Sequence, residues 1–203
     1  MKDRLRFFEN QASDWEKVHY PPHVRQRLEA LVKEFGVRGG EQVLDVGTGT
    51  GVLIPYLRRE VGASGRIFGV DFSFQMLRQA NRKPRGVMDI IVQADVHFLP
   101  FANEIVDRVI CFAAFPHFTD KAKALREMSR VLRHDGILII AHLLSREELS
   151  KHHSAHPAVA SDTLPDNHRM RSLFIDAGVL PLEVVNTPGK YLAKGKKEVQ
   201  GGK

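Results

Sequence analysis

The sequence of 203 residues contains one cysteine, Cys111, and no apolar run near the roughly 20 residues that cross a bilayer. A single cysteine excludes an internal disulfide framework, which agrees with a reducing compartment. The N-terminal stretch MKDRLRFFENQ has charges where a signal peptide needs apolar residues. These absences predict a cytoplasmic protein without a membrane span.

The sequence also lacks a concentrated basic region that would account for its net charge of +6. Such a charge would suit an acidic partner such as nucleic acid, but the lysines and arginines are scattered over the predicted helices. Their one dense group lies near the C-terminus: Lys190, Lys194, Lys196, Lys197 and Lys203. We therefore expect residues 196–203 to form a solvated, disordered tail, and nucleic acid is not the predicted partner.

Apolar runs alternate with amphipathic segments from residue 41 onward, which indicates βαβ units and a mainly parallel sheet. Strands are expected at 42–46, 66–70, 88–92, 106–112, 137–141, 182–186 and 190–193. Helices are expected at 52–61, 74–81, 121–132 and 166–177. Two capping-box patterns, Ser13–Glu16 and Ser145–Glu148, predict further helix starts. No internal repeat or low-complexity linker interrupts the chain, so one domain is predicted.

The segment VLDVGTGTG, residues 43–51, places three glycines at alternating positions between a predicted strand and a predicted helix. Glycines permit positive φ and a close approach of the backbone to a ligand. The free N–H groups that begin the helix favour an electronegative group. A dinucleotide-binding loop has the spacing G-x-G-x-x-G, and Val52 takes the place of its third glycine here. The spacing therefore disfavours a nicotinamide dinucleotide.

Acidic residues follow the next two strands. Asp71 ends the second strand and, beside the glycine loop, could accept hydrogen bonds from two ribose hydroxyls. Its alternative role is to cap the helix that begins at residue 74, although Ser73 could cap it equally well. Asp95 follows the third strand and could accept from an exocyclic amine such as that of adenine. Leu99 and Phe101, just beyond it, could sandwich a base or pack in the core.

Four segments in this order, VLDVGTGTG, GVDFSFQML, QADVHFLPF and EMSRVLRHDGILII, resemble the class I S-adenosylmethionine-dependent methyltransferases of the UbiE, or type 11, kind. The resemblance covers residues 41–142. It implies an α/β fold with a Rossmann-like, doubly wound, seven-stranded sheet, mostly parallel with an antiparallel last strand. It also divides the chain into an N-terminal helical cap (1–40), a cofactor-binding core (41–142) and a substrate-side segment with the last strands (143–203).

The resemblance assigns roles to residues at matching positions. The methionine part of the cofactor would be held by Asp45, Gly47, Thr48, Gly49 and Gly51. The ribose would be bound by Asp71, and the adenine by Phe72, Met76, Asp95 and Val96. Phe112 would form the floor near the sulfonium, and Tyr20 would reach the cofactor. The segment from Phe8 to Trp15 resembles a short helix that covers the pocket. The chain departs from the family at Arg133-His134-Asp135-Gly136, where Lys-Pro-Gly-Gly is usual, and Gly136 preserves the turn.

The segment after the fourth strand, CFAAFPH (residues 111–117), contains no acid and no Asn-Pro-Pro-Tyr signature. That absence argues against the common nucleic-acid and protein methyltransferases and favours a small-molecule acceptor, including one that contains a metal. A methyltransferase acting on nucleic acid or protein, and a non-catalytic cofactor-binding partner protein, are the alternatives. Cys111 is interpreted as a small buried hydrophobe rather than a nucleophile.

Histidines are the remaining candidates for chemistry. His117, His142, His152 and His153 are candidate general bases on the substrate side. His152, His153 and His156 could instead bind a metal or a metal-containing substrate through imidazole nitrogen. Their spacing is not a standard zinc pattern, and they could also be solvent-exposed polar residues. A metal cofactor therefore stays an open question at the level of sequence.

Overall fold

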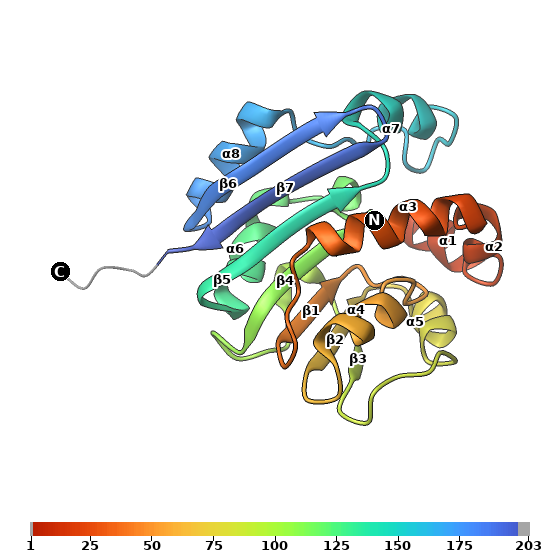
Figure 1. Cartoon of the computed structure of the whole chain (residues 1–203). Coiled ribbons are helices and arrows are strands. Elements are labelled where there is room, and N and C mark those ends of the chain that lie inside the picture. Colours follow the sequence, from red (N-terminus) through yellow and green to blue (C-terminus); the bar gives the residue numbers. More distant parts are fainter. Residues whose placement is uncertain (1, 199–203) are drawn as a thin grey trace.

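The computed structural model describes residues 2–198 and contains one seven-stranded sheet in the order β3-β2-β1-β4-β5-β7-β6. The strands are β1 (Gln42–Val46), β2 (Arg66–Asp71), β3 (Ile90–Gln93), β4 (Val106–Phe112), β5 (Leu132–His142), β6 (Val179–Thr187) and β7 (Lys190–Lys197). Neighbours among the first five strands pair in parallel, and β7 runs antiparallel to both β5 and β6. The predicted fold class is confirmed (Figure 1).

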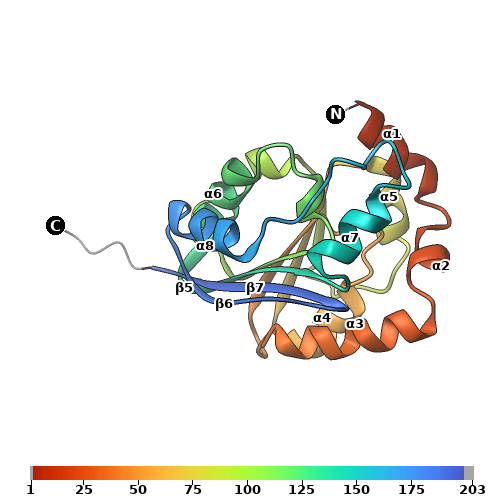
Figure 2. The same cartoon turned by 90° about the horizontal axis from the view of Figure 1, so that it is seen from above.

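Helices cover both faces of the sheet. They are α1 (Lys2–Gln11), α2 (Trp15–His19), α3 (Pro22–Glu34), α4 (Ile54–Val61), α5 (Phe74–Ala80), α6 (Lys121–Val131), α7 (Arg146–His153) and α8 (Asn167–Asp176). In Figure 2, α6, α7 and α8 lie on one side of the sheet, and α3 and α4 lie on the other. Alternate residues of β1 follow this division, since Val43 belongs to the apolar cluster that contains Leu28 of α3, while Leu44 belongs to the cluster that contains Leu125 of α6. Strands buried on both faces are near-continuous apolar runs for this reason.

Most local predictions agree with the structure, and the two capping boxes differ in outcome. Ser145 accepts from the backbone N–H of Glu148, whose side chain accepts in return from the Ser145 N–H, so the capping box of α7 is confirmed. The box predicted at Ser13 is wrong. The N-cap of α2 is Asp14, and the Ser13 hydroxyl donates to the Asp14 carboxylate instead of capping the helix. Within residues 2–198, no helix combines the length and apolar character needed to cross a membrane.

The lysines at positions 190, 194, 196 and 197 belong to strand β7 of the sheet rather than to a disordered tail. Strand β7 extends to Lys197, because its antiparallel pairing with β5 reaches Lys196 and its pairing with β6 reaches Lys197. The prediction of a disordered tail is therefore wrong for residues 196 and 197, and residues 199–203 lie outside the described part. Four ion pairs join the lysines to acidic residues: Lys190–Glu34, Lys194–Glu183, Lys196–Asp135 and Lys197–Glu104. Each pair is partly exposed and stabilises little, but together they offset the basic group.

Candidate active site

The glycine loop connects β1 to α4 at the carboxyl edge of the sheet. A positive φ and a close contact both require a glycine at position 47. Its φ is +72°, and a Cβ built there would lie 2.2 Å from the Cβ of Ala114, in the segment after β4. The N–H groups of Gly47 and Thr48 both donate to the Val70 carbonyl of β2, at 2.8 and 2.9 Å. These bonds hold the loop beside the end of β2, which carries Asp71.

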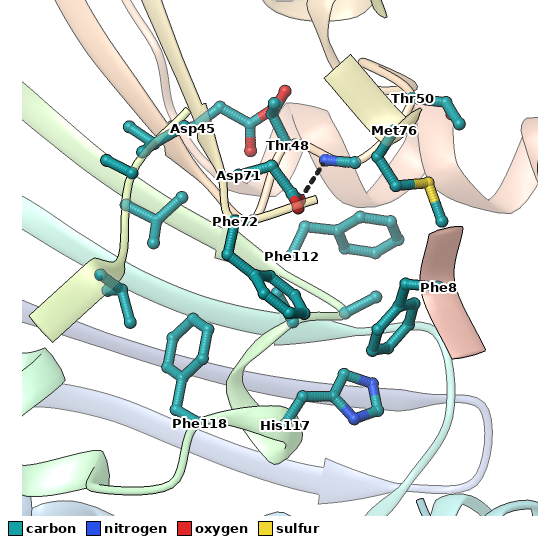
Figure 3. A pocket seen from close by; sticks show the side chains of 18 of the residues that line it. Phe8, Asp45, Thr48, Thr50, Asp71, Phe72, Met76, Phe112, His117 and Phe118 are labelled. Carbon is teal, nitrogen blue, oxygen red and sulfur yellow. Dashed lines mark hydrogen bonds between the residues drawn. The ribbon is translucent and has the colours of Figure 1, made fainter. Parts of the chain in front are cut away.

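Asp71 is buried, and its two oxygens are already oriented by the backbone. Oδ2 accepts from the Gly49 N–H at 2.8 Å (Figure 3), and Oδ1 accepts from the Ser73 N–H at 2.9 Å. Burial raises the pKa of this carboxyl to about 6, while the backbone donors limit the rise. Ser73, not Asp71, caps α5, because its hydroxyl accepts from the Met76 N–H. The alternative role of Asp71 as a helix cap is thus excluded.

A second carboxylate, Asp45 of β1, lies buried near Asp71. Burial raises the pKa of Asp45 to about 7, and the charge of Asp71 adds to the rise. The Thr48 hydroxyl opposes it by donating to Asp45 Oδ2 at 2.6 Å. Two buried carboxyls at one edge create a negative potential, which favours a ligand with cationic groups over one with phosphates.

A cavity opens at this edge of the sheet, between the ends of β1, β2 and β4 and the N-terminal helices. Its wall includes every predicted cofactor-binding residue except Gly51: Asp45, Gly47, Thr48, Gly49, Asp71, Phe72, Met76, Asp95, Val96, Phe112 and Tyr20. Gly51 instead faces α5, and a Cβ there would lie 3.1 Å from the Cβ of Ala80. Its role is close packing of the loop on a helix rather than ligand contact. By contrast, a Cβ at Gly49 would meet only the Gly47 carbonyl, at 4.0 Å, so this glycine leaves space for a ligand.

Asp95 lines the far end of the cavity together with His97, which the sequence analysis did not single out. Asp95 Oδ1 accepts from the His97 backbone N–H at 2.9 Å and lies 2.5 Å from ring Nδ1 of the same residue. Leu99 and Phe101 are absent from the wall. Leu99 is buried in the core, and the Phe101 ring packs against Phe68 with centroids 5.4 Å apart. Of the two roles considered for Leu99 and Phe101, core packing is the correct one.

The N-terminal helices cover the cavity, as the resemblance implied. Phe8, Trp15 and Tyr20 all contribute to its wall. Glu16 of α2 accepts from the Thr50 hydroxyl at 2.7 Å and pairs with Lys83. Burial alone would raise the pKa of Glu16, but the bonds from Lys83, Thr50 and Arg25 hold it below its usual range. An ionised Glu16 therefore ties α2 to the glycine loop.

The four candidate base histidines are not equivalent in the structure, since only His117 lines the cavity. His142 lies behind Phe112, with ring centroids 6.5 Å apart, and its Nδ1 accepts from the Leu144 N–H. Burial lowers the pKa of His142 to about 3, so it is neutral at pH 7. His152 and His153 lie at the end of α7, outside the wall.

The metal site considered as one alternative for His152, His153 and His156 is not formed. No three histidine, cysteine, aspartate or glutamate side chains within residues 2–198 are grouped so that they could hold a metal ion. The ring of His153 turns inward, where its Nδ1 lies 2.6 Å from the Asp162 carbonyl. The rings of His152 and His156 stack edge-on with centroids 5.9 Å apart. The three rings thus contact protein atoms and are not grouped as ligands of one metal ion.

Comparison with known proteins agrees with this geometry. Residues 44–140 match the family described as methyltransferase domain. A ubiquinone/menaquinone biosynthesis C-methyltransferase from Pectobacterium carotovorum is 31% identical over 185 residues, covering 78% of this chain and 74% of that protein. The chain belongs to the class I S-adenosylmethionine-dependent methyltransferases. The corresponding Klebsiella pneumoniae enzyme is 37% identical over 127 residues, but the chain spans only about half (51%) of its length.

Solved structures support the fold of this methyltransferase. A methyltransferase from Haloferax volcanii, solved in complex with an activator protein, superposes with a TM-score of 0.81 at 22% identity, covering 95% of this chain and 98% of the other. One from Aquifex aeolicus superposes with a TM-score of 0.75 at 23% identity, over 92% and 98% of the two chains.

The cavity suits the cofactor of the family, S-adenosylmethionine, which supplies an electrophilic methyl group on a sulfonium. Asp71 would offer its carboxylate oxygens to the ribose hydroxyls, and Asp45 would contribute negative charge near the glycine loop, beside the cationic methionine part. Apolar side chains of Phe72, Met76 and Val96 can contact a planar base. The cavity therefore offers carboxylates and apolar side chains of the kinds that the polar and planar parts of this cofactor would need.

Proposed function

We propose that this enzyme transfers the methyl group to a small molecule with a planar, hydroxylated ring. The observation that carries the proposal is the aromatic wall around His117. The Phe8 ring lies edge-on to the His117 imidazole with centroids 4.9 Å apart, and Phe118 lines the same cavity (Figure 3). Aromatic rings favour a flat apolar acceptor, and a polar group among them would orient its hydroxyl.

Three further points support a small acceptor. The relatives that match most of the chain bear the name of C-methyltransferases of ubiquinone and menaquinone biosynthesis, and quinones are small planar rings. The cavity is also covered by α1 and α2, which would have to move aside for an exposed site on a polymer to enter. The four lysines of β7 in the basic group are paired with acids, which gives little support to a nucleic-acid acceptor. The cytoplasmic location stays a prediction.

Two experiments test the proposal in sequence. Calorimetric titration with S-adenosylmethionine and S-adenosylhomocysteine should give saturable binding at one site per chain. Transfer of a radiolabelled methyl group should then be measured to 1,4-naphthohydroquinone, to an unmodified RNA transcript and to an unmethylated protein mixture. Label on the hydroquinone alone would support the proposal. Label on RNA or protein, with none on the hydroquinone, would refute the small acceptor while leaving the methyltransferase assignment intact.

A further inference from the structure

A buried carboxylate outside the cavity wall contacts two residues that line the cavity, His117 and Arg4. Asp162 lies in the loop between α7 and α8 and is 4% exposed. Its Oδ2 lies 2.8 Å from Nδ1 of His117 and accepts from Nε of Arg4 at 2.9 Å, while its Oδ1 accepts from Nη2 of Arg4 at 2.5 Å. A buried carboxylate needs such partners to remain charged, so this trio is the arrangement that stabilises it.

The contact with Asp162 determines which nitrogen of His117 carries the proton. An ionised carboxylate only accepts hydrogen bonds, so Nδ1 must be the protonated nitrogen and Nε2 holds the lone pair. Nε2 makes no hydrogen bond within residues 2–198. The buried side-chain atoms without partners in that range are His19 Nε2 and Arg58 Nε, and His117 Nε2 is not among them. It therefore contacts accessible space, and His117 lines the cavity.

Charged and titratable groups on several elements pack around His117, Asp162 and Arg4. They are Lys121 on α6, His142 on β5 and His153 on α7. Burial lowers the pKa of His117, the Asp162 carboxylate opposes that effect, and His153 and Arg4 reinforce it. The ring is consequently neutral at pH 7, as a general base must be before it accepts a proton.

Arg4 brings the N-terminal helix into this arrangement. It extends from α1 to a residue 158 positions away, and Phe8 of the same helix packs its ring edge-on to His117 with centroids 4.9 Å apart. When α1 covers the cavity, Arg4 shares the negative charge of Asp162. Without Arg4 the whole charge would act on His117 and favour its protonated form.

We propose that Asp162 positions His117 to act as general base toward the acceptor, and that Arg4 joins this arrangement only when α1 covers the cavity. The inference rests on the proposed function. The acceptor hydroxyl would give its proton to His117 Nε2, while an electron pair of the acceptor forms the bond to the methyl carbon. The bond between that carbon and sulfur breaks, and its electron pair stays on sulfur as a thioether. Charge is conserved because His117 gains one positive charge with the proton, while the sulfonium loses one.

The direct test is nitrogen NMR of protein labelled in histidine, which reports the tautomer and pKa of each ring without cofactor or acceptor. His117→Gln assigns the resonance. We expect wild-type His117 to carry its proton on Nδ1 and to titrate below the ordinary histidine range. Arg4→Gln should raise its pKa, and Asp162→Asn should lower it and populate the other tautomer. Arg6→Gln, an exposed change of equal charge on the same helix, should leave the resonance unchanged.

Several outcomes would overturn the proposal. A wild-type ring that is protonated on Nε2, or an equal response to Arg4→Gln and Arg6→Gln, would show that the trio is only a structural tie. Should Asp162→Asn fail to fold, Arg4→Gln still decides the matter, because it leaves the contact between Asp162 and His117 in place. Titrating the same samples with S-adenosylmethionine separates the two proposals. If the wild type does not bind S-adenosylmethionine, the proposed function is refuted. If it binds, but the His117 resonance is the same in the wild type and in the variants, only this inference is refuted.

With 1,4-naphthohydroquinone as acceptor, the pH dependence of kcat/KM gives a second measure. Arg4→Gln should move the acidic limb of the profile to higher pH with little loss at its plateau. Asp162→Asn should lower the plateau tenfold or more, since a general base contributes about 10²–10⁴-fold when it is correctly oriented. Unchanged limbs in both variants would refute a role for the trio in proton transfer.

Discussion

Replacing Asp71 by asparagine tests the cofactor site most directly, because the change keeps the shape of the side chain and removes its charge. The carboxylate accepts from Gly49 and Ser73 and would accept from two ribose hydroxyls. A hydrogen bond to a charged group contributes about 1.5–3 kcal/mol. Weakening both ribose bonds should cost about 3 kcal/mol, which corresponds to on the order of a hundredfold in Kd.

The pKa of Asp71 adds a second observable to this prediction. Because burial raises that pKa to about 6, the wild type should lose affinity for S-adenosylmethionine as the pH falls from 8 through 6, where the carboxyl gains a proton. Asp71→Asn should show a weak affinity that hardly changes over this range. Calorimetry at pH 8, 7, 6 and 5 measures both effects, and Asp176→Asn, an exposed change on α8, controls for the loss of one carboxylate. A variant that binds within threefold of the wild type would refute the ribose assignment.

Three other substitutions test how the site is supported. Gly47→Ala would place a methyl group 2.2 Å from Ala114 at a positive φ, and we expect a loss of about 3 kcal/mol of stability, measured as a fall in Tm. Asp45→Asn should stabilise the unliganded protein, because burial raises the Asp45 pKa from 3.8 to about 7. The folded state binds the proton more tightly than the unfolded state, so the wild type loses stability as the pH rises from about 4 to 7. In urea unfolding, the unfolding free energy of Asp45→Asn should therefore exceed that of the wild type by at most about 4 kcal/mol above pH 7 and should equal it near pH 3. His142→Leu should lower the unfolding free energy by about 1–3 kcal/mol, because the Leu144 N–H loses its acceptor, and should leave the pH profile of methyl transfer unchanged. A shift of the acidic limb of that profile would contradict the choice of His117 as base.

The sequence alone determined the features that depend on near neighbours in the chain. Alternating apolar runs and helical segments specified the parallel core, because strand and helix periodicities are local properties. The glycine loop and Asp71 could be placed together because β1 and β2 are adjacent strands whose carboxyl ends meet at one edge. Even the Ser145 capping box was accessible, since both of its hydrogen bonds join residues three positions apart.

Tertiary structure decided what depends on distant residues. Leu99 proved to be core and Gly51 a packing contact, because the neighbours that determine each role come from other elements. Among the histidines, nothing local distinguishes His117 from His142, whereas the fold turns one toward the cavity and the other behind Phe112. Nothing in the local sequence indicates a role for Asp162, since it lies 45 residues from His117 and 158 from Arg4. Only the folded chain brings these three side chains into contact, because the free energy that aligns them comes from burying the helices and loops that carry them.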